Sequence, residues 1–404
     1  MRAFTRSIAS LVLAFAVACP VAITYSSLSA QPAAKKGKAV NKGAPTKAGP
    51  PPRTPFTAKD EEIAVIPGIP DARFWADSEA DFAKALPQQK GPWLALSAGG
   101  SDGAYGAGLL SGLSASGKRP EFAVVTGVST GALMASYAFL GSAYDEQLRD
   151  AFSSITAADV FEAGATPESL LDTWPLREVI AKRVTPKLLA DIAAEHARGR
   201  RFFVLTTNLD AERFVVWNMG AIASAGDEKA LKLFRDVLVA ASSVPGMFPP
   251  GYIEVEANGK KFQEMHADGG IGTQFFVAPE SVLTSFSTYN LPATDLYVIV
   301  NGKLTPDFQV GDRSTVAILG RSVGVAIKAA ARTAIDRAYL TAKRSGVGFH
   351  LAYIDTSFTQ QSRMLFDPEY IKALFMRGLE QGKTGTAFLA HPPDLSNRPA
   401  PMVK

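Results

Sequence analysis

The sequence predicts an α/β protein whose sheet is mainly parallel and covered by helices on both faces. Short apolar runs, rich in β-branched and aromatic residues, alternate along the chain with longer stretches of helical periodicity. Two glycine-rich turns each follow an apolar run and precede a helical stretch, and active sites of parallel sheets gather at such strand ends. The chain has 404 residues, of which 47% are hydrophobic and 20% charged, which is enough to bury a large core.

The expected strands are short and almost free of charge, which favours burial on both faces of the sheet. They are 93–97, 122–126, 202–207, 296–300 and 351–354. The helical patterns are 104–113, 130–140, 176–195, 228–241, 316–343 and 368–381. We expect one folded domain over 58–390 and a C-terminal tail over 391–404.

Residues 1–30 have the pattern of a secretory signal. Two arginines precede a charge-free run that is strongly apolar from Ile8 to Thr24, and small residues follow. One expectation is cleavage after Ala30. Another is a lipoprotein signal ending at Cys19, which closes a weak bacterial lipobox, and a third is an uncleaved anchor. The protein is therefore expected to be exported, in a periplasmic, secreted or outer-membrane-tethered form.

Residues 31–57 are expected to be a disordered linker, because its Pro, Ala, Gly and Lys residues cannot form a core. Residues 1–55 hold eight Lys or Arg and no Asp or Glu, so the remainder has 34 basic and 38 acidic groups. The excess of basic residues belongs to the N-terminal extension, and nothing in the domain predicts nucleic-acid binding. The domain also has no cysteine for a disulfide or a metal site.

The segment Gly127-Val128-Ser129-Thr130-Gly131 has the G-x-S-x-G pattern of a nucleophile elbow between a predicted strand and a predicted helix. Its two glycines, Gly127 and Gly131, permit a tight turn that exposes the serine hydroxyl above the sheet. The N-terminus of the following helix supplies free N–H groups and a partial positive charge, which stabilise developing negative charge. Ser129 is therefore the candidate nucleophile.

A serine nucleophile needs a proton acceptor, because its hydroxyl reacts poorly at neutral pH. Asp268 is one candidate, since Gly269 and Gly270 follow it in a turn-prone stretch and would allow close approach to the serine. A histidine-dependent α/β-hydrolase esterase would instead use His350 or His391, neither of which stands in a recognisable catalytic context. A non-catalytic exported envelope or binding protein is the remaining alternative.

A second glycine loop, Gly99-Gly100-Ser101-Asp102-Gly103, lies between the first predicted strand and a helix. Successive backbone N–H groups in such a loop can hold an anion. The phosphate-binding pattern G-x-x-x-x-G-K-[ST] is absent, so an oxyanion hole beside the nucleophile elbow is the better interpretation.

In this order the motifs resemble those of the patatin-like phospholipases. The loop at 96–103 is similar to the family's oxyanion loop, and Gly127–Gly131 to its nucleophile elbow. Asp268-Gly269-Gly270 is similar to its catalytic Asp-Gly-Gly, and 241–250 to its Ser-x-x-Pro-x-x-Phe-Pro-Pro segment. The resemblance covers roughly 94–280, the motif core of the domain. It implies a three-layer α/β/α patatin-like fold with a mainly parallel central sheet.

The resemblance also implies a lipid acyl hydrolase of the phospholipase A or esterase type. In such an enzyme Ser129 attacks an ester carbonyl, Asp268 accepts its proton, and an acyl-enzyme forms. The N–H groups of Gly99 and Gly100, helped by Thr130, would hold the oxyanion. The resemblance requires no metal and no organic cofactor, and its expected partner is a lipid or ester substrate at a membrane surface.

Three departures from the family pattern bear on the substrate. Ala98 replaces the first glycine of the usual triplet, and 271–275 lacks the usual Asn before Pro. Asp102 stands where the family usually has Arg or Lys, and a carboxylate there would repel a lipid phosphate. Neutral esters therefore remain possible beside phospholipids. His266, two residues before Asp268, is a possible modulator of that carboxylate.

Overall fold

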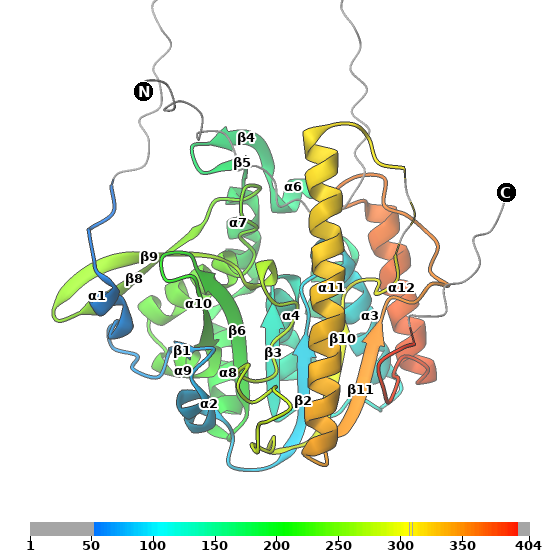
Figure 1. Cartoon of the computed structure of the whole chain (residues 1–404), viewed down its shortest axis with the longest axis horizontal. Coiled ribbons are helices and arrows are strands. Elements are labelled where there is room, and N and C mark those ends of the chain that lie inside the picture. Colours follow the sequence, from blue (N-terminus) through cyan, green and yellow to red (C-terminus); the bar gives the residue numbers. More distant parts are fainter. Residues whose placement is uncertain (1–51, 307, 309, 395–404) are drawn as a thin grey trace, which may run out of the picture.

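The computed structural model describes residues 52–306, 308 and 310–394. The predicted signal at 1–30 with Cys19, most of the predicted linker and the end of the predicted tail lie outside the described residues. The described chain forms a central sheet with helices on both sides (Figure 1). None of its helices is long and apolar enough to cross a membrane.

Five parallel strands make the centre of the sheet, in the order β6-β3-β2-β10-β11. They are β2 Gly91–Leu96, β3 Val124–Val128, β6 Arg201–Asn208, β10 Ala293–Val300 and β11 Gly348–Tyr353. These are the five predicted strands, with shifted ends. Because all five run in one direction, the loops that follow them meet at one end of the sheet, which we call its carboxyl end.

Antiparallel strands that the sequence analysis did not predict extend the sheet beyond β6. They are β1 Arg73–Trp75, β7 Arg213–Asn218, β8 Gly251–Ala257 and β9 Lys260–Asp268. β7 pairs with β6 and β1, and the β8–β9 hairpin joins through β9, whose last residues pair with β6. A separate hairpin, β4 Glu162–Thr166 and β5 Ser169–Asp172, lies at the carboxyl end in Figure 1.

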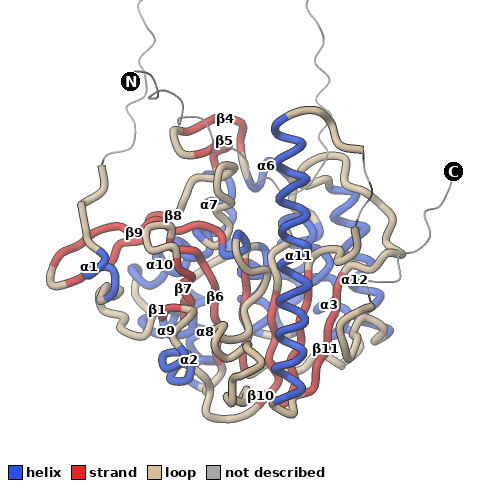
Figure 2. Tube along the Cα trace, in the orientation of Figure 1, coloured by secondary structure: helices blue, strands red, loops and turns tan. Residues whose placement is uncertain are grey.

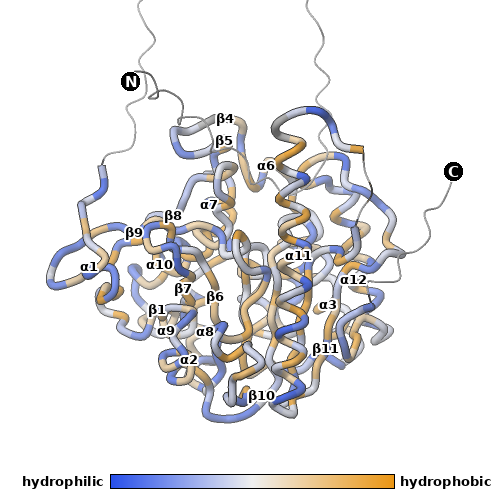
Figure 3. Tube along the Cα trace, viewed as in Figure 1, coloured by the Kyte–Doolittle hydropathy of each residue, from blue (hydrophilic) through white to orange (hydrophobic). Residues whose placement is uncertain are grey.

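Helices cover the sheet in two layers, and side-chain alternation along β2 divides the core between them. Leu94 and Leu96 belong to the core on one face, and Trp93 and Ala95 to the core on the other. The first face packs against α3 Gly103–Ala115, α4 Thr130–Leu140, α5 Asp145–Ser153, α7 Trp174–Arg183, α8 Pro186–Ala197, α9 Met219–Ala225, α10 Glu228–Ala240 and α12 Pro368–Thr384. The second packs against α2 Glu79–Ala85 and α11 Thr315–Arg344. This is the expected three-layer α/β/α arrangement, traced in Figure 2, with apolar residues along the central strands in Figure 3.

Two predictions about local structure are wrong. The helix expected over 176–195 is two helices, because Thr185 caps α8 with its side chain and Pro186, at the first helical position, lacks an N–H. The disordered linker does not reach residue 57. Arg53 forms a bidentate ion pair with Asp210, and Thr57 caps the short helix α1 Ala58–Glu62.

Candidate active site

Ser129 lies in a strained turn between the end of β3 and the start of α4. Its φ of 55° and ψ of −125° are sparsely populated by residues other than glycine. The flanking glycines are required sterically, because a Cβ at Gly127 would stand 2.5 Å from the Gly131 oxygen and one at Gly131 2.4 Å from the Leu96 oxygen. The predicted nucleophile elbow is therefore present as backbone geometry.

Asp268 is the last residue of β9 and is 3% exposed. Its backbone N–H donates to the Ser243 carbonyl at 2.9 Å, and its Oδ1 accepts from the Gly270 N–H at 2.7 Å. Gly269 begins a short 3₁₀ turn in which a Cβ would stand 3.0 Å from the Leu205 oxygen. The Asp-Gly-Gly motif thus turns the chain at a strand end, so that the carboxylate faces the elbow.

The Ser129 hydroxyl and the Asp268 carboxylate are brought together from positions far apart in the sequence. Burial raises the pKa of Asp268 to about 6, against the opposing effects of hydrogen bonds from the Ser129 hydroxyl and the Gly270 N–H. A carboxylate with this pKa is ionised at neutral pH and can accept a proton from the hydroxyl.

The oxyanion loop is fixed by Asn301, which sequence reasoning missed. The Asn301 side chain donates to the Ser97 carbonyl at 2.9 Å and accepts from the Gly106 N–H at 3.1 Å. Its backbone oxygen would stand 2.2 Å from a Cβ at Gly99. Gly100 adopts the left-handed conformation that favours glycine, with φ of 57°. A polar residue directly after the apolar run of β10 was the available signal for Asn301.

Thr130 meets the oxyanion loop from the other side. A Cβ at Gly103 would stand 2.4 Å from the Thr130 hydroxyl oxygen, so only glycine permits this approach of α3 to α4. Gly100, Ser101, Ser129 and Thr130 all line one cavity. The structure therefore places Gly100 and Thr130 at the same cavity as Ser129, whereas Gly99 packs against Asn301 and does not line the cavity.

The cavity beside Ser129 is apolar and has a volume of about 110 Å³. It follows the face of α4 from Ser129 through Leu133 to Tyr137, which spans roughly 12 Å at 1.5 Å per residue. Helices α5, α7 and α10 supply further walls; representative lining residues are Phe152, Leu176, Ile180 and Leu238. Val244 and Phe248 join them from the Ser-x-x-Pro segment. Such a cavity can hold the apolar part of a ligand whose polar end reaches Ser129.

Asp102 does not line this cavity. Its Oδ1 accepts a hydrogen bond from the Tyr370 hydroxyl of α12 at 2.8 Å. The carboxylate that replaces the family's usual cation is thus held against α12, beside the site rather than within it.

The four histidines have contacts away from Ser129. His350 pairs with Asp295 at 2.8 Å and stacks on Tyr297, toward the amino ends of β10 and β11. The exposed His391 contacts the Pro392 carbonyl. His196 packs against Gly220.

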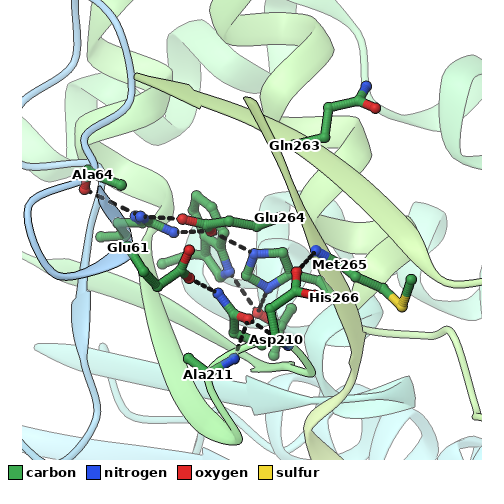
Figure 4. Close-up of polar contacts among 12 residues, drawn as sticks. Glu61, Ala64, Asp210, Ala211, Gln263, Glu264, Met265 and His266 are labelled. Carbon is green, nitrogen blue, oxygen red and sulfur yellow. Dashed lines mark hydrogen bonds and ion pairs between the residues drawn. The ribbon is translucent and has the colours of Figure 1, made fainter. Parts of the chain in front are cut away.

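The expected modulator His266 instead belongs to a buried polar network on β9 (Figure 4). Its Nδ1 contacts the Thr206 hydroxyl at 3.0 Å and its Nε2 contacts Glu264 at 2.9 Å. Glu264 in turn forms a bidentate ion pair with Arg73. His266 is therefore held by these partners, and the hydrogen bonds that Asp268 accepts come from other residues.

One protein-family model matches the segment that carries most of this geometry. The model described as patatin-like phospholipase matches residues 94–279, which include the oxyanion loop, the elbow and the Asp-Gly-Gly motif. Residues 94–279 are a patatin-like phospholipase domain. The chain thus carries a domain of a lipase- and phospholipase-type hydrolase family, whose members act on lipids.

No curated protein matches the chain in sequence. Among solved structures, the crystal structure of VipD from Legionella pneumophila is 12% identical, with a TM-score of 0.32. That match covers 74% of this chain and 68% of the other.

The residues that line the cavity of the patatin-like domain were not predicted as a site. Leu133 and Tyr137 follow Ser129 at helical spacing, a pattern that equally describes an ordinary buried helix face. Among the described residues, no group of three or more His, Cys, Asp or Glu side chains could hold a metal ion.

Proposed function

We propose that the protein is a lipid acyl hydrolase that cleaves carboxylic esters through a Ser129–Asp268 dyad. The observation that carries the proposal is the strained elbow serine, whose side chain lowers the pKa of a buried aspartate that the Asp-Gly-Gly turn holds nearby. The apolar cavity that begins at the same serine supports a substrate with an acyl chain.

In the proposed reaction the acyl chain occupies the cavity and its ester carbonyl lies over Ser129. Asp268 accepts the hydroxyl proton as the serine oxygen attacks the carbonyl carbon. The tetrahedral oxyanion is stabilised by N–H groups of the glycine loop at Gly99 and Gly100 and by Thr130 at the start of α4. The ester oxygen leaves with the proton from Asp268, and the acyl-enzyme remains.

Water then hydrolyses the acyl-enzyme, and the same groups assist this step. Asp268 accepts a proton from the attacking water, a second tetrahedral intermediate forms, and Ser129 regains its proton as the fatty acid departs. Burial favours this proton exchange, because it places the pKa of Asp268 close to the working pH.

The proposed substrates include both phospholipids and neutral esters. Asp102 is hydrogen-bonded to Tyr370 and does not line the cavity. Its negative charge therefore does not exclude a phosphate-containing head group from the cavity entrance. Comparing the rates on nitrophenyl esters and on phospholipid vesicles distinguishes the two substrate classes.

We also propose that the protein is exported, on the support of the charged start and apolar run of residues 1–30. The N-terminus of the mature chain, measured by mass spectrometry, distinguishes Gln31 from a lipid-modified Cys19. An unprocessed Met1 in the soluble cell fraction would contradict export.

The test of the dyad measures fatty-acid release from short-chain nitrophenyl esters and from mixed phospholipid vesicles. Ser129→Ala and Asp268→Asn are expected to lower kcat by about 10⁴-fold or more. The controls His350→Gln and His391→Gln should retain activity within about threefold. Loss of activity in a histidine variant, with release retained in Asp268→Asn, would support the histidine-dependent alternative instead.

A further inference from the structure

Six large apolar side chains, each half or more exposed, belong to segments at the carboxyl end of the sheet. We call them the apolar rim: Trp174, Phe308, Val310, Ile318, Val325 and Met364. Their exposures run from 50% for Trp174 to 92% for Phe308. Exposed apolar groups gathered at one end of a molecule indicate a surface that another apolar phase covers.

The segments that carry the rim lie at the same end of the sheet as the candidate active site. In Figure 1 the β4–β5 hairpin and the N-terminal ends of α7 and α11 lie beyond the carboxyl ends of β2 and β3. The loop that carries Phe308 and Val310 leaves β10 at Asn301, the residue packed against Gly99 of the oxyanion loop. This part of the rim therefore follows, along the chain, the residue that packs against the oxyanion loop.

Ring contacts connect the remaining rim segments across the cavity. Phe161 lies 6.1 Å from Phe248 and 6.3 Å from Phe366, measured between ring centroids, and both of these residues line the cavity. Met364 precedes Phe366 by two residues. Trp174 likewise precedes the cavity-lining Leu176 by two. The same segments thus place one side chain in the cavity and another in solvent.

The opposite end of α11 provides a contrast. Phe286 and Leu340 are 93% and 60% exposed, as much as Phe308 and Ile318. Arg344, the last residue of α11, donates to the Thr284 carbonyl at 2.7 Å, which places both near the amino ends of the strands. These two residues match the rim in exposure and chemistry but lie far from the site.

The charges near the rim do not favour an anionic partner. The rim segment 301–328 has four basic and two acidic residues, whereas 156–173, which includes the β4–β5 hairpin, has four acidic and none basic. A surface of mixed charge with exposed apolar groups suits a zwitterionic lipid surface. Tryptophan side chains such as that of Trp174 are enriched at the level of the lipid head groups.

We propose that the apolar rim inserts into the surface of a zwitterionic lipid bilayer and presents the cavity to it. The inference rests on the proposed function. If the substrate is an acyl ester taken from a membrane, the apolar phase that covers the rim is the lipid bilayer. The continuity of rim and cavity then gives the lipid a path to Ser129 that avoids transfer through water.

The first test measures vesicle binding without catalysis. The full-length chain carrying Ser129→Ala is floated with phosphatidylcholine vesicles, alone and with two added pairs of substitutions. The rim pair Phe308→Ser with Ile318→Ser should lower the bound fraction at least tenfold. The matched pair Phe286→Ser with Leu340→Ser should leave it within twofold, and the leader contributes equally to every protein.

A second measurement does not depend on the folding of the rim variant. Brominated lipid should quench the fluorescence of Trp174 in the Ser129→Ala chain, and Trp174→Phe should remove most of that quenching. The other three tryptophans contribute little, because Trp93 and Trp217 are buried and the half-buried Trp75 belongs to β1, away from the rim segments. Equal quenching with and without Trp174 would overturn the proposal.

Two further outcomes separate this inference from the proposed function. Rim variants should hydrolyse a soluble nitrophenyl ester like the unmodified enzyme and lose at least tenfold of their activity on vesicles. If no ester is hydrolysed but vesicle binding still depends on the rim, the proposed dyad is wrong and the proposed lipid-binding surface is supported. If the rim pair binds vesicles normally and instead disperses a dimer in sedimentation, the rim is a self-association surface and the proposal is wrong.

Discussion

Strand β9 carries two buried carboxylates on one face, and their surroundings differ sharply. Glu264 is 0% exposed and has Arg73 and His266 as partners. Burial opposes its ionisation, but the hydrogen bond from His266 and the charge of Arg73 lower its pKa overall. Asp268, four residues later, has no cation among the groups that shift its pKa, which burial raises to about 6.

The difference separates a structural carboxylate from a reactive one. The charge of Glu264 is balanced by Arg73, and Glu264 orients His266. Burial lowers the pKa of His266. We therefore expect this cluster to keep its protonation state near neutral pH. Asp268 shares its charge with a hydroxyl and one backbone N–H, which leaves it able to accept a proton. Mutations in the two clusters should therefore affect different quantities.

The largest expected effect follows from Asp268→Asn. We expect kcat to fall about 10⁴-fold, because the amide cannot accept the serine proton. Stability should change in the opposite direction. The folded pKa of about 6 lies above the unfolded value of 3.8, so ionisation of Asp268 lowers stability as pH rises through 6. Asp268→Asn should raise the melting temperature at pH 8, and a lowered melting temperature would contradict this assignment.

Arg73→Met should produce the reverse pattern. It leaves Glu264 buried without its cation, which is expected to lower the free energy of unfolding by roughly 3–5 kcal/mol. Urea unfolding measures this loss. The kcat of the native fraction on a soluble ester should stay within about threefold. A large fall in kcat without loss of stability would place Arg73 in the chemistry and break the comparison.

The pH dependence of kcat/KM tests the base directly. Activity should fall about tenfold per pH unit below about 6, because protonated Asp268 cannot take the serine proton. The same acid limb should persist in His350→Gln and in Glu61→Gln, since neither side chain is the proposed base. A limb that moved or vanished in one of these variants would assign the base elsewhere.

Glu61→Gln should give the smallest of the four effects. Burial and the nearby charge of Glu264 raise the pKa of Glu61 to about 7, partly offset by a hydrogen bond from Asn208. Because 7 lies above the unfolded value of 4.5, stability is lost as pH rises through 7. The substitution should stabilise the protein by roughly 1–3 kcal/mol at pH 8 and leave it unchanged near pH 4. Urea unfolding at both values checks the difference.

Sequence alone predicted what local backbone geometry encodes. Gly127, Gly131 and Gly103 are places where a Cβ would meet backbone or hydroxyl oxygen at 2.4–2.5 Å, and such requirements leave a readable pattern. The parallel strands were equally readable, because burial on both faces makes them continuous apolar runs.

Long-range partners left no such pattern. Glu264 and Arg73 are 191 positions apart, and Asn301 meets Ser97 across 204. The hairpin that presents Asp268 was also missed, since β8 and β9 alternate buried and exposed residues over short, charged stretches. The cavity was invisible for another reason: apolar residues that line a pocket have the same spacing as those that fill a core.

The central claim, that Ser129 is activated by Asp268, is tested most directly by a fluorophosphonate serine probe with peptide mapping. The unmodified chain should be labelled at Ser129, and Ser129→Ala should not be labelled. Asp268→Asn should react at least a hundredfold more slowly than the unmodified chain. Arg73→Met should react at the unmodified rate after correction for its native fraction. Labelling at another residue, or equal labelling of the unmodified and Asp268→Asn chains, would contradict the dyad.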